Sequence, residues 1–151
     1  MSPSSILKEL MHGSPEERKD TINRLKKTGN KEVSEVIEKL IYSVKHEKEP
    51  KNRANAILAL GELNDENYQN YHDIIIETIT ESCEEPHSLV RYAAASALAN
   101  IGSESCIPAL KRLIYDKDKK VSACAEDGLN KIMLTHAYSE TLESDDNYSD
   151  E

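Results

Sequence analysis

One pattern occurs twice between Leu89 and Ile132, and it constrains the fold more than any other feature of the chain. Aligning Arg91 with Ser122 sets the two copies 31 residues apart. Small and aliphatic residues then recur in pairs, namely Ala94 with Ala125, Leu98 with Leu129, and Ile101 with Ile132. A period of this length is typical of stacked helical repeats, in which each helix pair buries its apolar face against the next. Such arrays present binding surfaces more often than catalytic pockets.

The same frame extends towards the N-terminus. Arg53 and Arg18 are the equivalents of Arg91, at spacings of 38 and 35 residues. Apolar periodicity and Pro or Gly breaks predict helices over residues 14–29, 32–48, 50–63, 68–84, 87–101, 106–115 and 119–134. We therefore expect an all-α fold of about four stacked helix pairs.

Charge is uneven along the chain. The net charge is −9, and six acids without any Lys or Arg lie between Glu140 and Glu151. Such a segment buries too little apolar surface to offset its ordering entropy, so we predict a solenoid domain over 1–138 and a disordered acidic tail over 139–151. The rest of the chain, at −3, has no continuous basic face, and nucleic acid is not an expected partner.

The choice of compartment rests on three absences from the sequence. No apolar run approaches the roughly 20 residues that span a bilayer, so no membrane association is expected. The N-terminus lacks the basic and apolar regions of a secretory signal. The chain has three Cys, an odd number without framework spacing, which favours reduced thiols. We expect a cytoplasmic protein.

The residues of the third unit resemble those of a known repeat. Val90-Arg91-x-x-Ala94-x-x-Ala97-Leu98-x-x-Ile101-Gly102, followed by Cys106-Ile107-Pro108-Ala109-Leu110, looks like a HEAT repeat of the short type first described in phycobilisome lyases. The resemblance implies a right-handed α-solenoid of about four antiparallel helix pairs. The fourth unit departs from the pattern, with Ser122 in place of Arg and Gly128 in place of Ala.

What the resemblance implies about function is broad, because these repeats serve as scaffolds, adaptors, chaperones and lyase subunits. We favour a non-catalytic interaction scaffold or adaptor, and the alternative is a bilin lyase or a lyase-accessory or chaperone subunit. Iron-binding enzymes of this superfamily hold their metal with paired His-Glu dipeptides, whereas this chain has only His46-Glu47. No catalytic motif, metal site or cofactor is predicted.

The recurring arginines predict a structural feature. In the repeats that the chain resembles, such an Arg bonds acids or carbonyls in the neighbouring loop. We therefore expect a structural ladder formed by Arg53, Arg91, Glu85 and Asp116. The alternative is that these arginines contact a ligand directly.

The side of the second helices that faces away from the repeated Ala and Leu positions is the predicted binding surface. Its middle is small and weakly apolar, which suits a partner's helix or extended peptide with Tyr92 as the anchor. The predicted groove residues are Ala54, Asn55, Leu58, Tyr92, Ser96, Asn100, Asp127 and Lys131. The alternative is that small residues here only let adjacent repeats pack closely. The partner is expected to be another protein, and association with a second copy stays open.

Overall fold

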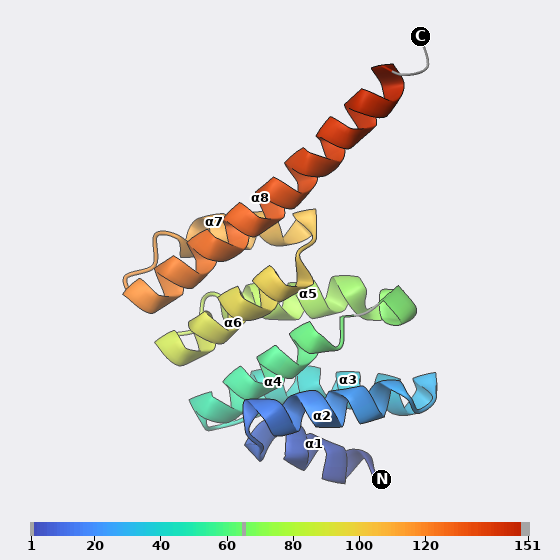
Figure 1. The fold of residues 1–151 in the computed structure, drawn as a ribbon. Coiled ribbons are helices and arrows are strands. Elements are labelled where there is room, and N and C mark those ends of the chain that lie inside the picture. The colour runs from blue at the N-terminus through green and yellow to red at the C-terminus, as the bar shows by residue number, and fades with distance from the viewer. Residues whose placement is uncertain (1, 65, 149–151) are drawn as a thin grey trace.

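The computed structural model describes residues 2–64 and 66–148, and within them it contains helices and no strand. Four helix pairs follow one another along the chain, as Figure 1 shows. They are α1 (Pro3–His12) with α2 (Pro15–Lys26), α3 (Asn30–His46) with α4 (Pro50–Glu62), α5 (His72–Ser82) with α6 (Ser88–Ile101), and α7 (Ile107–Leu113) with α8 (Lys119–Tyr148). Two short 3-10 helices, Glu66–Tyr71 and Glu104–Cys106, precede α5 and α7. The predicted all-α solenoid of four helix pairs is confirmed.

Local sequence explains where the helices begin and end. The Ser14 hydroxyl accepts the N–H of Glu17 at 3.2 Å, and Pro15 occupies the first turn of α2, where its missing N–H is not needed. Helix α4 likewise begins at Pro50. Helix α6 ends at Gly102, whose φ of 71° lies in the left-handed region that glycine adopts without a steric penalty.

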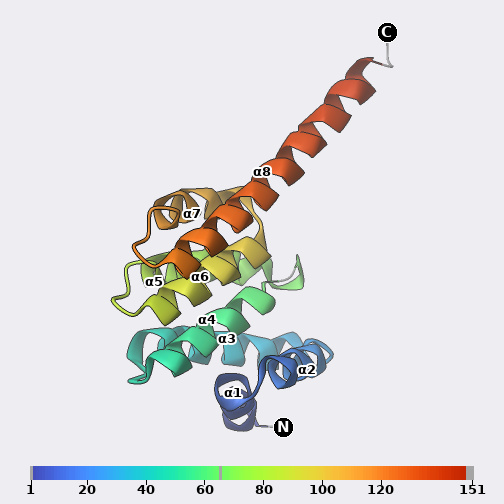
Figure 2. The same cartoon turned by 60° about the vertical axis from the view of Figure 1, so that its left-hand side comes forward.

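The second helices of the pairs, α2, α4, α6 and α8, form one side of the solenoid, and the last three of them pack closely in a row (Figure 2). Small residues make this close packing feasible. A Cβ added at Gly61 would lie 2.9 Å from the Cβ of Ala97, and one added at Gly128 would lie 2.5 Å from the Cβ of Ala99. The departure of Gly128 from the repeat pattern is thus explained, because Ala99 occupies the space that an Ala side chain would need.

The first pair packs differently from the others. Helix α1, rather than α2, makes the larger contact with α4, and α1 also packs against α3. The amide Nδ2 of Asn55 donates to the carbonyl oxygen of Met11 at 2.6 Å, and Ala54 is only 3% exposed. The prediction that Ala54 and Asn55 line an open groove is therefore wrong. The frame treated all four pairs as equivalent, whereas α1 covers the first turns of α4.

The C-terminal part of the chain also differs from the prediction. The backbone of residues 139–148 continues α8 as a helix, where a disordered tail was expected, and Figure 1 shows this part running beyond the stacked pairs. The sequence contains no Gly or Pro after Gly128 that would end the helix. Residues 149–151 of the predicted tail lie outside the described residues, and the domain boundary at residue 138 stays a prediction.

Candidate partner-binding groove

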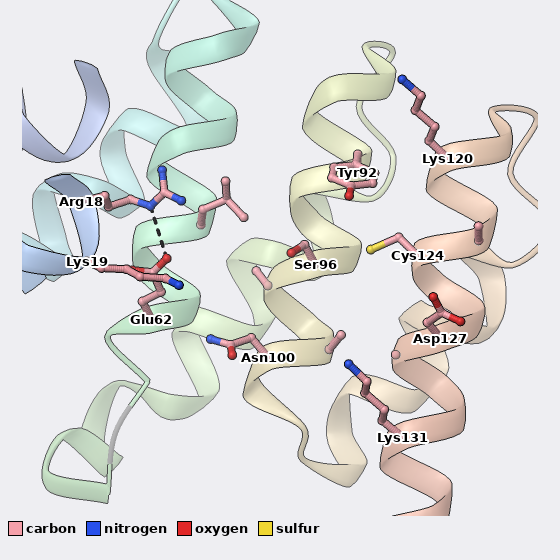
Figure 3. Close-up of a pocket in the computed structure, with 15 residues that line it drawn as sticks. Arg18, Lys19, Glu62, Tyr92, Ser96, Asn100, Lys120, Cys124, Asp127 and Lys131 are labelled. Carbon is pink, nitrogen blue, oxygen red and sulfur yellow. Dashed lines mark hydrogen bonds and ion pairs between the residues drawn. The ribbon is translucent and has the colours of Figure 1, made fainter. Parts of the chain in front are cut away.

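A groove of about 830 Å³ runs across the second helices, and each of these four helices contributes to its lining (Figure 3). Six of the eight predicted groove residues line it, and they are Leu58, Tyr92, Ser96, Asn100, Asp127 and Lys131. Leu58 is half-buried against the core, whereas Tyr92 is 43% exposed in the groove lining.

Small residues and larger side chains have separate roles in this surface. Ala97, Ala99 and Gly128 form part of the lining, and they are also the residues that bring adjacent helices close together. These three residues form the floor of the groove. For the floor, the alternative that small residues let adjacent repeats pack closely therefore applies. Tyr92 and Asn100 rise from the same helix with exposed side chains. The Nδ2 of Asn100 lies 3.5 Å from the carbonyl oxygen of Gly61, so this long hydrogen bond holds the amide at the edge of the floor.

The sequence frame missed much of the charge in the groove. Arg18, Lys19, Lys120 and Lys131 contribute four basic groups to the lining, against the two acidic groups of Glu62 and Asp127. Arg18 is nearly buried and its Nε pairs with Glu62 Oε1 at 3.3 Å. Over the described part of the chain, the other three basic side chains have no acidic group within ion-pair distance. The groove is therefore net positive in a chain whose net charge is −9.

A turn-by-turn reading of α8 would have found Lys120 and Cys124, which the prediction omitted. Lys120, Cys124, Asp127 and Lys131 all line the groove, and they follow one another at spacings of three or four residues on one helix face. The prediction assigned the fourth unit from its alignment with the Arg positions. That alignment gives Asp127 and Lys131 but passes over Lys120 and Cys124, because their equivalents in α6, Leu89 and Ala93, do not line the groove.

On the loop side of the second helices, Arg91 makes four hydrogen bonds. Its Nε and Nη2 donate to the two carboxylate oxygens of Asp116 at 2.8 and 3.2 Å. Its Nη1 donates to the carbonyl oxygens of Glu85 and Pro86, each at 2.8 Å. The ion pair is well shielded, since both side chains are 8% exposed. Arg91 thus links the loop before its own helix, α6, to the loop before the next second helix, α8.

Arg53 repeats this arrangement one pair earlier. Its Nε donates to Glu85 Oε1 at 2.6 Å, and its Nη1 donates to the carbonyl oxygens of Glu47 and Lys48. Arg18 does not follow the series. It reaches Glu62 at the end of α4, whereas the loop before α4 would be the equivalent target. The displaced first pair explains the change of partner.

The sequence profile of HEAT repeats matches residues 37–130 and 76–146, which together cover more than half of the chain. The chain belongs to the HEAT-repeat family. The resemblance to HEAT repeats is confirmed, and the first pair, which packs differently, lies wholly outside the matched residues.

Solved structures with this arrangement include human deoxyhypusine hydroxylase in complex with glycerol, at 19% identity and a TM-score of 0.60. That alignment covers 88% of this chain and 44% of the hydroxylase. A designed armadillo repeat protein is similar at 18% identity and a TM-score of 0.52, with 85% of this chain and 63% of the designed chain covered. At these identities the likeness concerns the fold alone. No curated protein sequence matches the chain.

Within the HEAT repeats, the pKa of the ladder residue Asp116 and the pKa values of the three thiols are shifted in opposite directions. The hydrogen bonds from Arg91 lower the pKa of Asp116, and the N–H of Asp118 adds a further bond at 2.9 Å. Burial raises the pKa of Cys83 to about 12 and also raises the pKa of Cys106 and Cys124. All three thiols are free, and Cys124 is the one that lines the groove.

No group of three or more His, Cys, Asp and Glu side chains is placed to hold a metal ion in the part of the HEAT array that the structure describes. None of the helices in that same part is both long and apolar enough to cross a membrane.

Proposed function

We propose that this HEAT array is a non-catalytic scaffold or adaptor whose groove binds a helix or extended segment of another protein. The observation that carries the proposal is the groove itself, which crosses all four second helices and is lined by a partly exposed Tyr92. A repeat array of this kind is compatible with a role in protein interaction.

The groove suits a bound segment for three physical reasons. Its floor is held by close helix packing at Gly61 and Gly128, so little ordering is required when a partner binds. Tyr92 offers a large aromatic surface with a hydroxyl, and residues of this type dominate the energetics of many protein interfaces. Ser96 and Asn100 lie on the same face as Tyr92 and offer hydrogen bonds to a partner's backbone or side chains.

Affinity capture followed by mass spectrometry tests the proposal when matched variants are used. Tyr92→Ala with Ser96→Arg removes the anchor and blocks the groove at exposed or half-buried positions. Tyr115→Ala is the control, because Tyr115 is 85% exposed and lies outside the groove lining. A partner that the wild type and the control retain and the groove variant loses, at unchanged melting temperature, supports the proposal.

A crosslinker attached at Cys124 then identifies the bound segment, since this thiol lines the groove. Crosslinks to one continuous segment of the partner are expected. Equal capture by the groove variant and the wild type would contradict the proposal. The bilin-lyase alternative rests on repeat resemblance alone, and absorbance after co-expression with a bilin source and an acceptor protein tests it.

A further inference from the structure

The groove and the C-terminal segment of the chain carry opposite charge. Lys19, Lys120 and Lys131 line the groove without an acidic group within ion-pair distance among the described residues. Residues 139–151 contain six acids and no Lys or Arg. The two features are complementary in sign, and each is unusual for the chain as a whole. The groove is net positive in an acidic protein, and the segment holds six acids within thirteen residues.

These two features do not meet within one copy. Lys131 and Glu140 belong to the same continuous helix, α8. At 1.5 Å per residue, Glu140 lies about 13.5 Å further along the helix axis than Lys131. Figures 1 and 2 agree that the C-terminal part of α8 runs away from the other second helices. The segment would have to break α8 to reach its own groove, whereas the groove of a neighbouring copy is open to it.

We propose that the groove binds the acidic C-terminal segment, residues 139–151, of a second copy of this chain. Two copies related by a twofold axis would each place this segment across the other's second helices, and Lys120 and Lys131 would face its carboxylates. The contact is then reciprocal and closes at a dimer. This inference uses the groove of the proposed function as its docking site but requires no other protein.

A charge swap in the full-length chain tests the proposal. In this experiment the groove variant is a different one from the Tyr92 and Ser96 variant above. It carries Lys120→Glu and Lys131→Glu, both at exposed positions. The tail variant carries Glu140→Lys, Glu143→Lys and Asp146→Lys. A control with Lys39→Glu and Lys111→Glu makes the same change in net charge at exposed sites outside the groove lining. Sedimentation velocity over a concentration series measures self-association, and circular dichroism checks that each variant is folded.

The wild type and the control should self-associate, more strongly at low salt, because the contact depends on exposed charges. The groove and tail variants alone should each associate more weakly by on the order of tenfold, through loss of several ion pairs. Their equimolar mixture should regain association, since an acidic groove then faces a basic tail and a basic groove faces an acidic tail.

Three results would overturn the proposal. They are a wild type that stays monomeric at all concentrations, a control that weakens association as much as the groove variant, and a mixture of folded variants that stays monomeric. None of them bears on the binding of another protein, which the Tyr92 and Ser96 substitutions report. Failure of this inference is therefore distinguishable from failure of the proposed function.

Discussion

Replacing Arg91 by Met tests the account of how the repeats are joined. The substitution keeps an apolar stem of similar length and removes the guanidinium group, which makes two hydrogen bonds to Asp116 and one each to two loop carbonyls. Asp116 is then left as a shielded carboxylate without its cation. Arg53→Met and Arg18→Met make the same chemical change at the equivalent positions. Arg53 loses fewer hydrogen bonds and a more exposed ion pair, and Arg18 loses a single contact to an acid.

The structure sets the order of the three effects. Breaking a buried ion pair on one side costs roughly 3–5 kcal/mol, and Arg91 pairs with Asp116 through both carboxylate oxygens, so we expect a loss of about 4 kcal/mol. Arg53 has one carboxylate contact, and its pair with Glu85 is 12% and 22% exposed, which predicts a loss of about 2 kcal/mol. The single 3.3 Å contact of Arg18 predicts about 1 kcal/mol.

Urea denaturation at pH 7 measures these losses as shifts of the midpoint at constant slope. For a chain of this size the loss at Arg91 corresponds to a fall in Tm of roughly 8–16 °C. Arg112→Met is the matched control, because Arg112 is exposed on α7, and its change should stay within about 0.5 kcal/mol. The ladder would be refuted as a stabilising feature if Arg91→Met cost less than about 1 kcal/mol, or if Arg53→Met cost more than Arg91→Met.

Arg91→Met should also change how the free energy of unfolding depends on pH, and the sign of this change follows from the pKa of Asp116. Its folded pKa lies below the ordinary value of 3.8, so the unfolded state binds more protons between the two values and stability rises with pH there. The contribution is fully present above pH 3.8 and is lost as the pH falls through the lowered pKa. In Arg91→Met the free energy of unfolding should therefore fall less steeply on acidification below about pH 4 than in the wild type.

Three further predictions follow from the packing of the helices. Gly128→Ala should destabilise by about 1 kcal/mol despite its better helix propensity, since the new Cβ meets Ala99, and adding Ala99→Gly should restore stability in a double-mutant cycle. Alkylation followed by mass spectrometry of the native protein should modify Cys124 before Cys83, whose pKa is about 12, and both rates should rise with pH. Asn55→Ala should cost about 1 kcal/mol and speed hydrogen exchange in α1 more than in α6, because the bond to Met11 is lost.

The periodic part of the fold was predictable because repetition and burial coincide. Ala94, Leu98 and their equivalents in the neighbouring pairs are buried in one continuous core. The position of α1 was not predictable from the frame, since residues 3–12 carry no copy of the Arg, Ala and Leu pattern. Its contact with α4 depends on individual partners such as Asn55 and Met11, which leave no periodic signal.

The groove was predictable in place and less so in charge. Tyr92 and Ser96 follow from counting along α6 from Arg91, and both line the groove. Lys120 and Cys124 do not follow from that count, because α8 presents a slightly different face to the groove than α6 does. The prediction already placed Asp127 and Lys131 in the groove, so what the alignment between repeats leaves out on α8 is one further basic residue, Lys120, and the thiol of Cys124.

The fourth unit shows that departures from a repeat pattern carry structural information. An Arg at the ladder position bonds the loop before its own helix and an acid in the loop of the next pair. Ser122, at the equivalent position of the fourth pair, has no such acid partner among the described residues. Ser122 makes the first bond alone, with its hydroxyl donating to the carbonyl oxygen of Ile114 at 2.7 Å. A hydroxyl at this position satisfies the carbonyl without adding a charge whose desolvation an acid would have to offset.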